Sequence, residues 1–147
     1  MFKHILIPND GSPVSAKAVK AGVAFAKETG ARVIGYYAHV PLSAHMHGEG
    51  YVLSEKLMAE MEHRSREYGE RCVAAIGRAA KHAGVPYESL VTEAAAPHLG
   101  IMDAAKKRRC DAIFMASHGH GVLARLLIGS VTNKVLILST IPVVVFR

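Results

Sequence analysis

The segment that decides the fold runs Ala116-Ser117-His118-Gly119 and, after nine further residues, Gly129-Ser130-Val131-Thr132. It follows a continuous apolar run, residues 111–115, which predicts a buried strand. Its second half opens an apolar stretch that predicts a helix. The first turn of a helix has unpaired N–H groups and the positive end of the helix dipole, which suit a phosphate. The segment therefore predicts an anion site at the carboxyl end of a strand.

Outward from this segment, apolar strands alternate with amphipathic helices. We expect strands at 2–8, 32–40, 87–92, 111–115 and 142–146. Helices are expected at 13–29, 54–83, 97–108 and 130–138, the first with Ser12 as its N-cap and Gly30 as its stop. Met58 and Met61, at helical spacing, are expected in the core or an interface. Residues 41–53 are expected to form a loop, and a short helical turn is expected near 123–127.

This alternation predicts one α/β domain over residues 1–147, a single open five-stranded parallel sheet with helices on both faces. Two strand orders, 2-1-3-4-5 and 3-2-1-4-5, are compatible with it. In the second order, the loops after strands one and four flank the switch point, and the glycine-rich segment follows strand four. The order 3-2-1-4-5 is therefore favoured.

Composition narrows the classes of function. Of the 147 residues, 50% are hydrophobic and 20% are charged, as in globular domains, and no apolar stretch is long enough to span a membrane. The first residues lack a signal-peptide pattern, and Cys72 and Cys110 have neither metal-ligand nor disulfide spacing, so we expect a cytoplasmic protein. The net charge of +6 suits an anionic ligand. No aromatic residues interleave with the basic cluster 106–109, so neither nucleic acid nor a membrane is expected as a partner.

Residues 5–12, 116–132 and 141–145 carry a family resemblance. Over its whole length the chain resembles the universal stress proteins, which implies a Rossmann-like fold of the adenine nucleotide α-hydrolase type. The ATP-binding branch of that family has the pattern Gly-x2-Gly-x9-Gly-(Ser/Thr). Here Gly119 and Gly129-Ser130 keep the spacing, and Ala116 stands at the first glycine. Its methyl group is tolerable where φ is negative and there is room beside the ligand.

The resemblance implies a nucleoside site at the ends of the first two strands. Asp10 would accept hydrogen bonds from the adenine amino group or the ribose hydroxyls, and Pro8 and Asn9 would shape the same corner. An Asp before Ser12 is equally explained as an Asx-turn. Val40 and Met115 would pack on the base, although strand-end residues of this kind are ordinarily core.

For the phosphates, the resemblance implies Ala116, Gly119, Gly129, Ser130, Val131 and Thr132. Ser130 is expected to be the N-cap of its helix and to offer its hydroxyl, while Val131 and Thr132 give backbone N–H groups. His118 and His120 face either the phosphates or solvent. Arg125 either neutralises phosphate charge or covers apolar surface with its stem.

Other motifs are weaker. The run 119–124 fits Gly-x-Gly-x-x-Ala, but it follows the fourth strand, and the sequence has no Gly-x4-Gly-Lys-(Ser/Thr) phosphate loop. Ser117 and His118 are not expected to act as nucleophile and base, because adjacent residues rarely point at one another. His39, His45 and His47 allow a transition-metal site, although a polar loop is the favoured interpretation.

Together these patterns predict a regulatory stress-response protein that binds ATP or another adenine nucleotide, with or without Mg²⁺ or Mn²⁺. The resemblance and the apolar strand Val143–Phe146, expected at the sheet edge, predict a homodimer through that strand, and protein partners remain unknown. Catalysis is not expected, because paired carboxylates and a metal-binding Asp cluster are missing from the sequence. Two alternatives stay open: a partner-binding module without nucleotide, and a slow nucleotide hydrolase or adenylyl-transfer enzyme.

Overall fold

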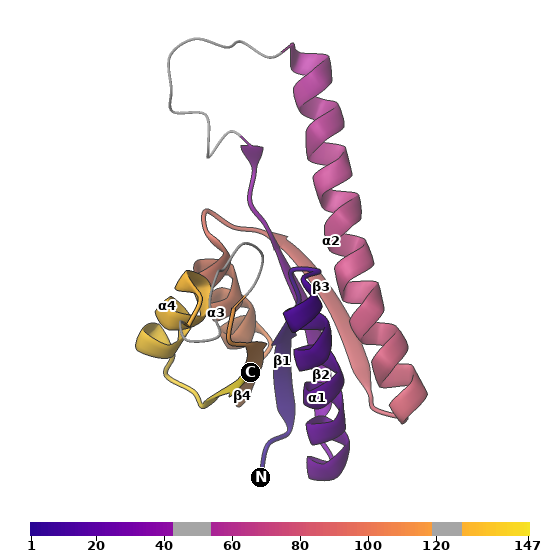
Figure 1. The fold of residues 1–147 in the computed structure, drawn as a ribbon, viewed down its shortest axis with the longest axis vertical. Helices are drawn as coiled ribbons and strands as arrows, with labels where there is room; N and C mark the ends of the chain where they lie inside the picture. The colour runs from indigo at the N-terminus through magenta and orange to yellow at the C-terminus, as the bar shows by residue number, and fades with distance from the viewer. Residues whose placement is uncertain (43–53, 119–127) are drawn as a thin grey trace.

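The computed structural model describes residues 1–42, 54–118 and 128–147, and its elements form one parallel sheet with the order β3-β2-β1-β4-β5 (Figure 1). The strands are β1 (His4–Pro8), β2 (Arg32–His39), β3 (Tyr87–Glu93), β4 (Ala112–Ala116) and β5 (Val143–Phe146). The helices are α1 (Pro13–Thr29), α2 (Glu55–Ala83), α3 (Pro97–Lys107) and α4 (Ser130–Leu138). The predicted fold class and strand order are confirmed. The predicted loop over 43–53 and the turn near 123–127 lie outside the described residues.

Local signals explain where the first two helices begin and end. The Ser12 hydroxyl accepts a hydrogen bond from the Ser15 amide at 3.1 Å, and the Ser54 hydroxyl accepts one from the Leu57 amide at 3.3 Å. Gly30 and Gly84 follow the two helices, each with a φ of 70°. That left-handed conformation carries little penalty for glycine, so each helix stops where the sequence places one.

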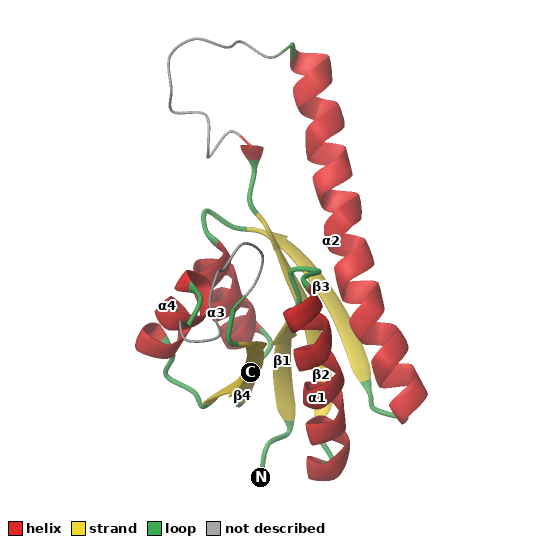
Figure 2. Ribbon diagram, viewed as in Figure 1, coloured by secondary structure: helices red, strands yellow, loops and turns green. Residues whose placement is uncertain are grey.

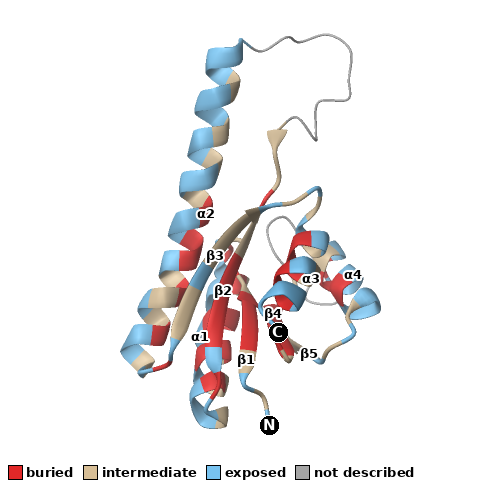
Figure 3. Ribbon diagram, turned by 180° about the vertical axis from the view of Figure 1, so that it is seen from behind, coloured by how far each residue is buried: buried red, intermediate tan, exposed pale blue. Residues whose placement is uncertain are grey.

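The helices cover both faces of the sheet (Figure 2). Side chains of β1 alternate between two cores: Ile5 and Ile7 pack with α1 and α2, whereas Leu6 packs with α3 and α4. The central strands are buried, as expected for a parallel sheet covered on both faces (Figure 3). Because β1 lies between β2 and β4, the carboxyl ends of these three strands meet at one edge, which is where the predicted site residues gather.

Helix α2 projects past the carboxyl end of the sheet (Figure 1). Its buried residues begin only at Gly69, and its first turns are exposed in Figure 3. Leu57 and Met61 are 42% and 39% exposed, so the expectation of a core position is wrong for Met61, while an interface position stays a prediction. The sheet ends before it can cover this part of the helix. Within the described part of the chain, no helix is both long and apolar enough to cross a membrane.

Candidate functional site

A cavity of about 440 Å³ opens at the carboxyl ends of β1, β2 and β4 and reaches the first turn of α4. Its volume is in the range of small-molecule sites. The predicted site residues that the structure describes all line it: Pro8, Asn9, Asp10, Val40, Met115, Ala116, His118, Gly129, Ser130, Val131 and Thr132. Gly119, also predicted, lies outside the described residues, as do His120 and Arg125. The structure thus brings together residues from three distant parts of the sequence, at the switch point of the sheet.

The corner after β1 is fixed by hydrogen bonds. The buried Asn9 amide donates to the Cys72 carbonyl at 2.9 Å, and its Oδ1 accepts from the Gly11 amide at 3.0 Å. Asp10 Oδ1 accepts from the Ser12 amide at 3.0 Å and from the Ser15 hydroxyl at 2.6 Å. The Asx-turn interpretation is therefore confirmed for Asp10. This turn also holds the carboxylate in the wall of the cavity, so it does not exclude a ligand role.

Tyr68 of α2 packs against the same corner. Its hydroxyl donates to the Asp10 carbonyl at 2.9 Å, and its ring meets Tyr37 edge-on at a centroid distance of 5.9 Å. Burial raises the pKa of both phenols, so they remain neutral hydroxyls at neutral pH. Gly11 has a φ of +81°, and a Cβ there would lie 2.1 Å from the Tyr68 hydroxyl. A glycine is therefore needed where the loop passes beneath α2.

The start of α4 differs from the expectation in one respect. Gly129, not Ser130, is the N-cap: its backbone is extended, and α4 has no side-chain capping bond. Ser130 is the first helical residue, so its hydroxyl is not used for capping and stands in the cavity wall. The Thr132 hydroxyl instead joins helix to sheet by donating to the Ala116 carbonyl at 2.9 Å. Amides of a first helical turn have no partner within the helix, which suits this end of the cavity to an anion.

Gly129 packs directly against the end of β4. Its amide donates to the Ser117 carbonyl at 2.7 Å. A Cβ at position 129 would lie 3.0 Å from the His118 Cα and 3.4 Å from the Ser117 carbonyl oxygen. The glycine therefore permits close approach of two backbone segments. This contact places the first turn of α4 beside the strand end.

Ala116 meets the backbone part of the condition set for it at the first glycine of the motif. It is the last residue of β4 and is paired with Phe146 of β5. Among the described non-glycine residues, Arg109 is the one with a positive φ, so Ala116 needs no glycine for its backbone conformation. Its side chain is part of the cavity lining.

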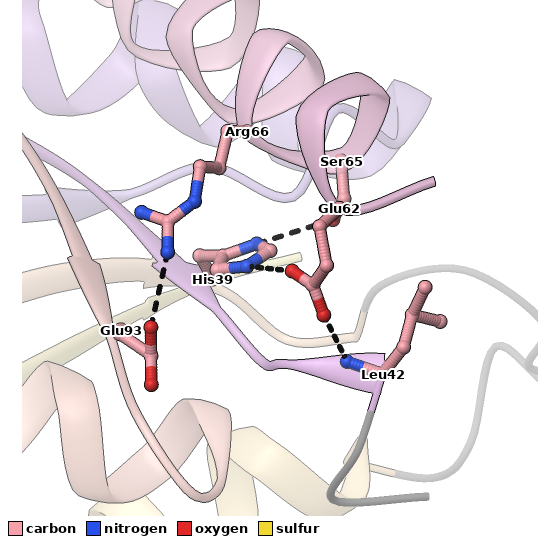
Figure 4. Close-up of polar contacts among 6 residues, drawn as sticks. All are labelled: His39, Leu42, Glu62, Ser65, Arg66 and Glu93. Atoms are coloured by element: carbon pink, nitrogen blue, oxygen red, sulfur yellow. Dashed lines mark hydrogen bonds and ion pairs between the residues drawn. The ribbon is translucent and has the colours of Figure 1, made fainter. Parts of the chain in front are cut away.

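Two expectations about histidines need correction. The Ser117 hydroxyl and His118 Nδ1 lie 3.0 Å apart, so these neighbours do point at one another, because the chain bends as β4 ends. His39 is fully buried, with Nε2 2.7 Å from Glu62 Oε2 and Nδ1 3.2 Å from the Ser65 hydroxyl (Figure 4). Both of its ring nitrogens are therefore engaged. His45 and His47 lie outside the described residues, and the described residues contain no group of three potential metal ligands.

The sequence did not identify part of the cavity wall: Ser15, Tyr36, Tyr37, Ala38, Ser65, Tyr68, Pro97 and Ile101. Ser65 and Tyr68 come from α2, whose path over the strand ends is set by tertiary packing. Their spacing of three residues on one helical face is the signal that could have linked them.

Comparison with known proteins places the chain in a family. The sequence profile of the universal stress protein family matches residues 1–147. The chain belongs to this family. It is 32% identical over 148 residues to universal stress protein MJ0531 of Methanocaldococcus jannaschii, covering 100% of this chain and 83% of that protein. It is 32% identical over 151 residues to universal stress protein YxiE of Bacillus subtilis, covering 100% of each.

Solved structures share the fold. The structure of hypothetical protein MJ0577, obtained for a structure-based assignment of biochemical function, has a TM-score of 0.81 at 27% identity and covers 99% of this chain and 95% of that chain. A universal stress protein in complex with cAMP has a TM-score of 0.71 at 19% identity, covering 99% and 97%. The Archaeoglobus fulgidus universal stress protein in complex with dAMP has a TM-score of 0.70 at 15% identity, covering 100% and 98%.

Proposed function

We propose that this universal stress protein binds an adenine nucleotide, with ATP as the first candidate, in the cavity at the switch point. The observation that carries the proposal is the first turn of α4, held by Gly129 against the end of β4 and open to a cavity of about 440 Å³. The complexes of related folds with cAMP and dAMP support an adenine nucleotide as the class of ligand.

The cavity has two chemically different ends. Ser130, Val131 and Thr132 form the first turn of α4 and line one end of the cavity, and amides of a first turn suit an anion, so we assign the phosphates there. Asp10 follows β1, and Val40 follows β2, which lies on the side of β1 away from β4 and α4. We assign the nucleoside to that end. Among the described cavity residues, Asp10 is the acidic one. A bound Mg²⁺ or Mn²⁺ would therefore be held mainly by the phosphates.

We propose a regulatory role in a cytoplasmic stress response, exerted as a homodimer through β5. Cys72 and Cys110 are buried free thiols, which suits a reducing compartment. Burial raises the pKa of the Cys110 thiol to about 12, so this cysteine is a poor nucleophile and serves packing.

Purified protein is expected to bind ATP at least about tenfold more tightly than GTP, because acceptors at the nucleoside end match the adenine amino group and oppose the guanine carbonyl. Titration calorimetry measures both affinities. Adenosine is the control, and it should bind much more weakly because it cannot use the first turn of α4. Absence of ATP binding at millimolar concentration would refute the proposal and favour the partner-binding module.

Restoring the first glycine of the motif, Ala116→Gly, is expected to leave the fold intact and change ATP affinity by less than about tenfold. The methyl group is already accommodated by an extended backbone, and the added chain flexibility costs about 0.5–1 kcal/mol of unfolding free energy. Thermal unfolding and calorimetry measure the two effects. A large gain from almost no binding would instead show that Ala116 makes the natural protein a non-binder.

A further inference from the structure

A partly buried hydrogen-bond chain joins α2 to His39, the last residue of β2 (Figure 4). Glu62 Oε1 accepts from the Leu42 amide at 2.6 Å, and Oε2 lies 2.7 Å from His39 Nε2. His39 Nδ1 lies 3.2 Å from the Ser65 hydroxyl. The bond from Leu42 and then that from His39 lower the pKa of Glu62, so it is a carboxylate at neutral pH. Arg66, one turn along, pairs with Glu93 at 3.0 Å.

This chain determines the direction of each hydrogen bond. A carboxylate only accepts, so His39 Nε2 must carry a proton and donate it to Glu62. In a neutral imidazole the other nitrogen then has no proton and only accepts. With the ring neutral, the Ser65 hydroxyl therefore donates to His39 Nδ1. The Ser65 oxygen then keeps two lone pairs, so Ser65 can accept a hydrogen bond from a ligand.

Ser65 lines the cavity at the nucleoside end. It shares this wall with Tyr37 of β2, with Val40 just after β2, and with Tyr68 of α2. The phosphate end is formed by α4, which follows β4 on the other side of β1. Ser65 therefore lies on the side of the cavity that we assign to the nucleoside, away from the first turn of α4.

We propose that Ser65, oriented by His39 and Glu62, is a specificity-determining acceptor that selects bases carrying an amino group over bases carrying a carbonyl group at the same position. This inference rests on the proposed nucleotide site. A base amino group gains a hydrogen bond to the Ser65 hydroxyl oxygen. A carbonyl group in its place meets lone pairs and leaves both acceptors unpaired. Glu62 and His39 act as positioning residues, since neither is part of the cavity wall.

The test compares ATP with ITP, in which a carbonyl replaces the adenine amino group. Dissociation constants for the two nucleotides are measured in the same slightly alkaline buffer. The wild type is expected to prefer ATP by about tenfold or more. Ser65→Ala removes the acceptor, so the preference should fall by at least about fivefold while the protein still binds ATP. An unchanged preference in Ser65→Ala would overturn the inference.

Glu62→Gln gives a sharper test because it keeps the shape and reverses the hydrogen bonds. The Leu42 amide can only donate, so it keeps the glutamine oxygen and leaves the NH2 group facing His39 Nε2. Nε2 must then accept, and Nδ1 must donate to Ser65. The Ser65 hydroxyl proton becomes available to the ligand, so the ATP preference should fall below that of Ser65→Ala and shift towards ITP.

Glu60→Gln is the matched control, since Glu60 lies on the same exposed turns of α2 and pairs with Arg64. It should keep the wild-type preference. A wild-type ratio in Glu62→Gln, with a folded protein by thermal unfolding, would overturn the positioning role. If the wild type binds neither ATP nor ITP, the proposed function fails and this inference with it. If the wild type binds ATP and neither Ser65→Ala nor Glu62→Gln changes the preference for ATP over ITP, this inference fails while the proposed function stands.

Discussion

Gly129→Val is expected to weaken nucleotide binding by at least about a hundredfold, the largest effect on the ligand of any single substitution in this site. A Cβ at position 129 would already lie 3.0 Å from the His118 Cα, so a branched side chain must push the first turn of α4 away from β4. That displacement removes at least two hydrogen bonds from helix amides to a charged phosphate, each contributing about 1.5–3 kcal/mol. Calorimetric titration with ATP measures the loss.

Two further substitutions separate binding from folding at this corner. Gly129→Ala adds only the tight Cβ and should give a smaller loss than valine. Ser130→Ala should weaken ATP binding by about 1–2 kcal/mol, the contribution of one hydrogen bond to a charged group. It should cost little stability, because α4 has no side-chain capping bond. Thermal unfolding is recorded for all three variants. A folded Gly129→Val protein that binds ATP as well as the wild type would show that the phosphate site is elsewhere.

The fold followed from local signals and one topological argument. Ser12, Gly30, Ser54 and Gly84 mark helix ends by caps and left-handed turns that depend on neighbours in sequence. The choice between two strand orders came from placing the segment 116–132 opposite the loop after β1. The observed order β3-β2-β1-β4-β5 agrees with that choice, because ligand sites of open parallel sheets gather where the order reverses.

The N-cap of α4 and the partners of His39 could not be predicted from the sequence, because both depend on contacts between distant segments. A serine at a helix start is usually a cap, but the extended residue before α4 is Gly129, where a Cβ would lie 3.0 Å from the His118 Cα. His39 lay near the end of the expected strand 32–40 and preceded His45 and His47, which allowed a metal site. Its actual partners, Glu62 and Ser65, lie on a helix more than twenty residues away in sequence, and no periodicity links them to β2.

Helix α2 illustrates the same limit on a larger scale. Its apolar positions form one continuous stripe in the sequence, which predicts a helix but not how much of the stripe the sheet can cover. The structure buries the stripe from Gly69 onward and leaves Leu57 and Met61 exposed. The part that passes over the strand ends supplies Ser65 and Tyr68 to the cavity. The part of the missed wall that α2 supplies and the exposure of Met61 therefore have one cause, the length of α2 relative to the strands.

The edge strand β5 carries the second prediction with a large effect. The amide of Ile113 in β4 donates to the Pro142 carbonyl, and the amide of Ser117, just after β4, donates to the Phe146 carbonyl. In a parallel ladder the intervening residues turn the opposite way, so the amides and carbonyls of Val143 and Val145 face the open edge of the sheet. An apolar edge whose backbone groups point away from the sheet invites a second strand, and a two-fold axis closes the assembly when β5 meets its own copy antiparallel.

Exposed apolar residues of the neighbouring helix extend this edge. Leu136, Ile137 and Leu138, at the end of α4, are 38%, 71% and 50% exposed, and α4 packs beside β5. We therefore expect light scattering at micromolar concentration to report twice the chain mass. A lysine at Val144 would also separate the subunits, but Val144 packs against the core shared by α1 and β1, so its charge would disturb the fold as well.

Val145→Pro removes a backbone N–H group that only the proposed dimer contact uses. The Val145 amide points away from β4, so proline there spares the internal ladder, and the extended backbone before it tolerates the ring. By symmetry the dimer loses two hydrogen bonds, about 2 kcal/mol in total, which weakens association by at least about thirtyfold. Val145→Ala keeps the amide and should remain dimeric, which separates the backbone contribution from that of the side chain. A wild type that stays monomeric, or a Val145→Pro protein that dimerises as tightly as the wild type, would show that β5 is not the interface.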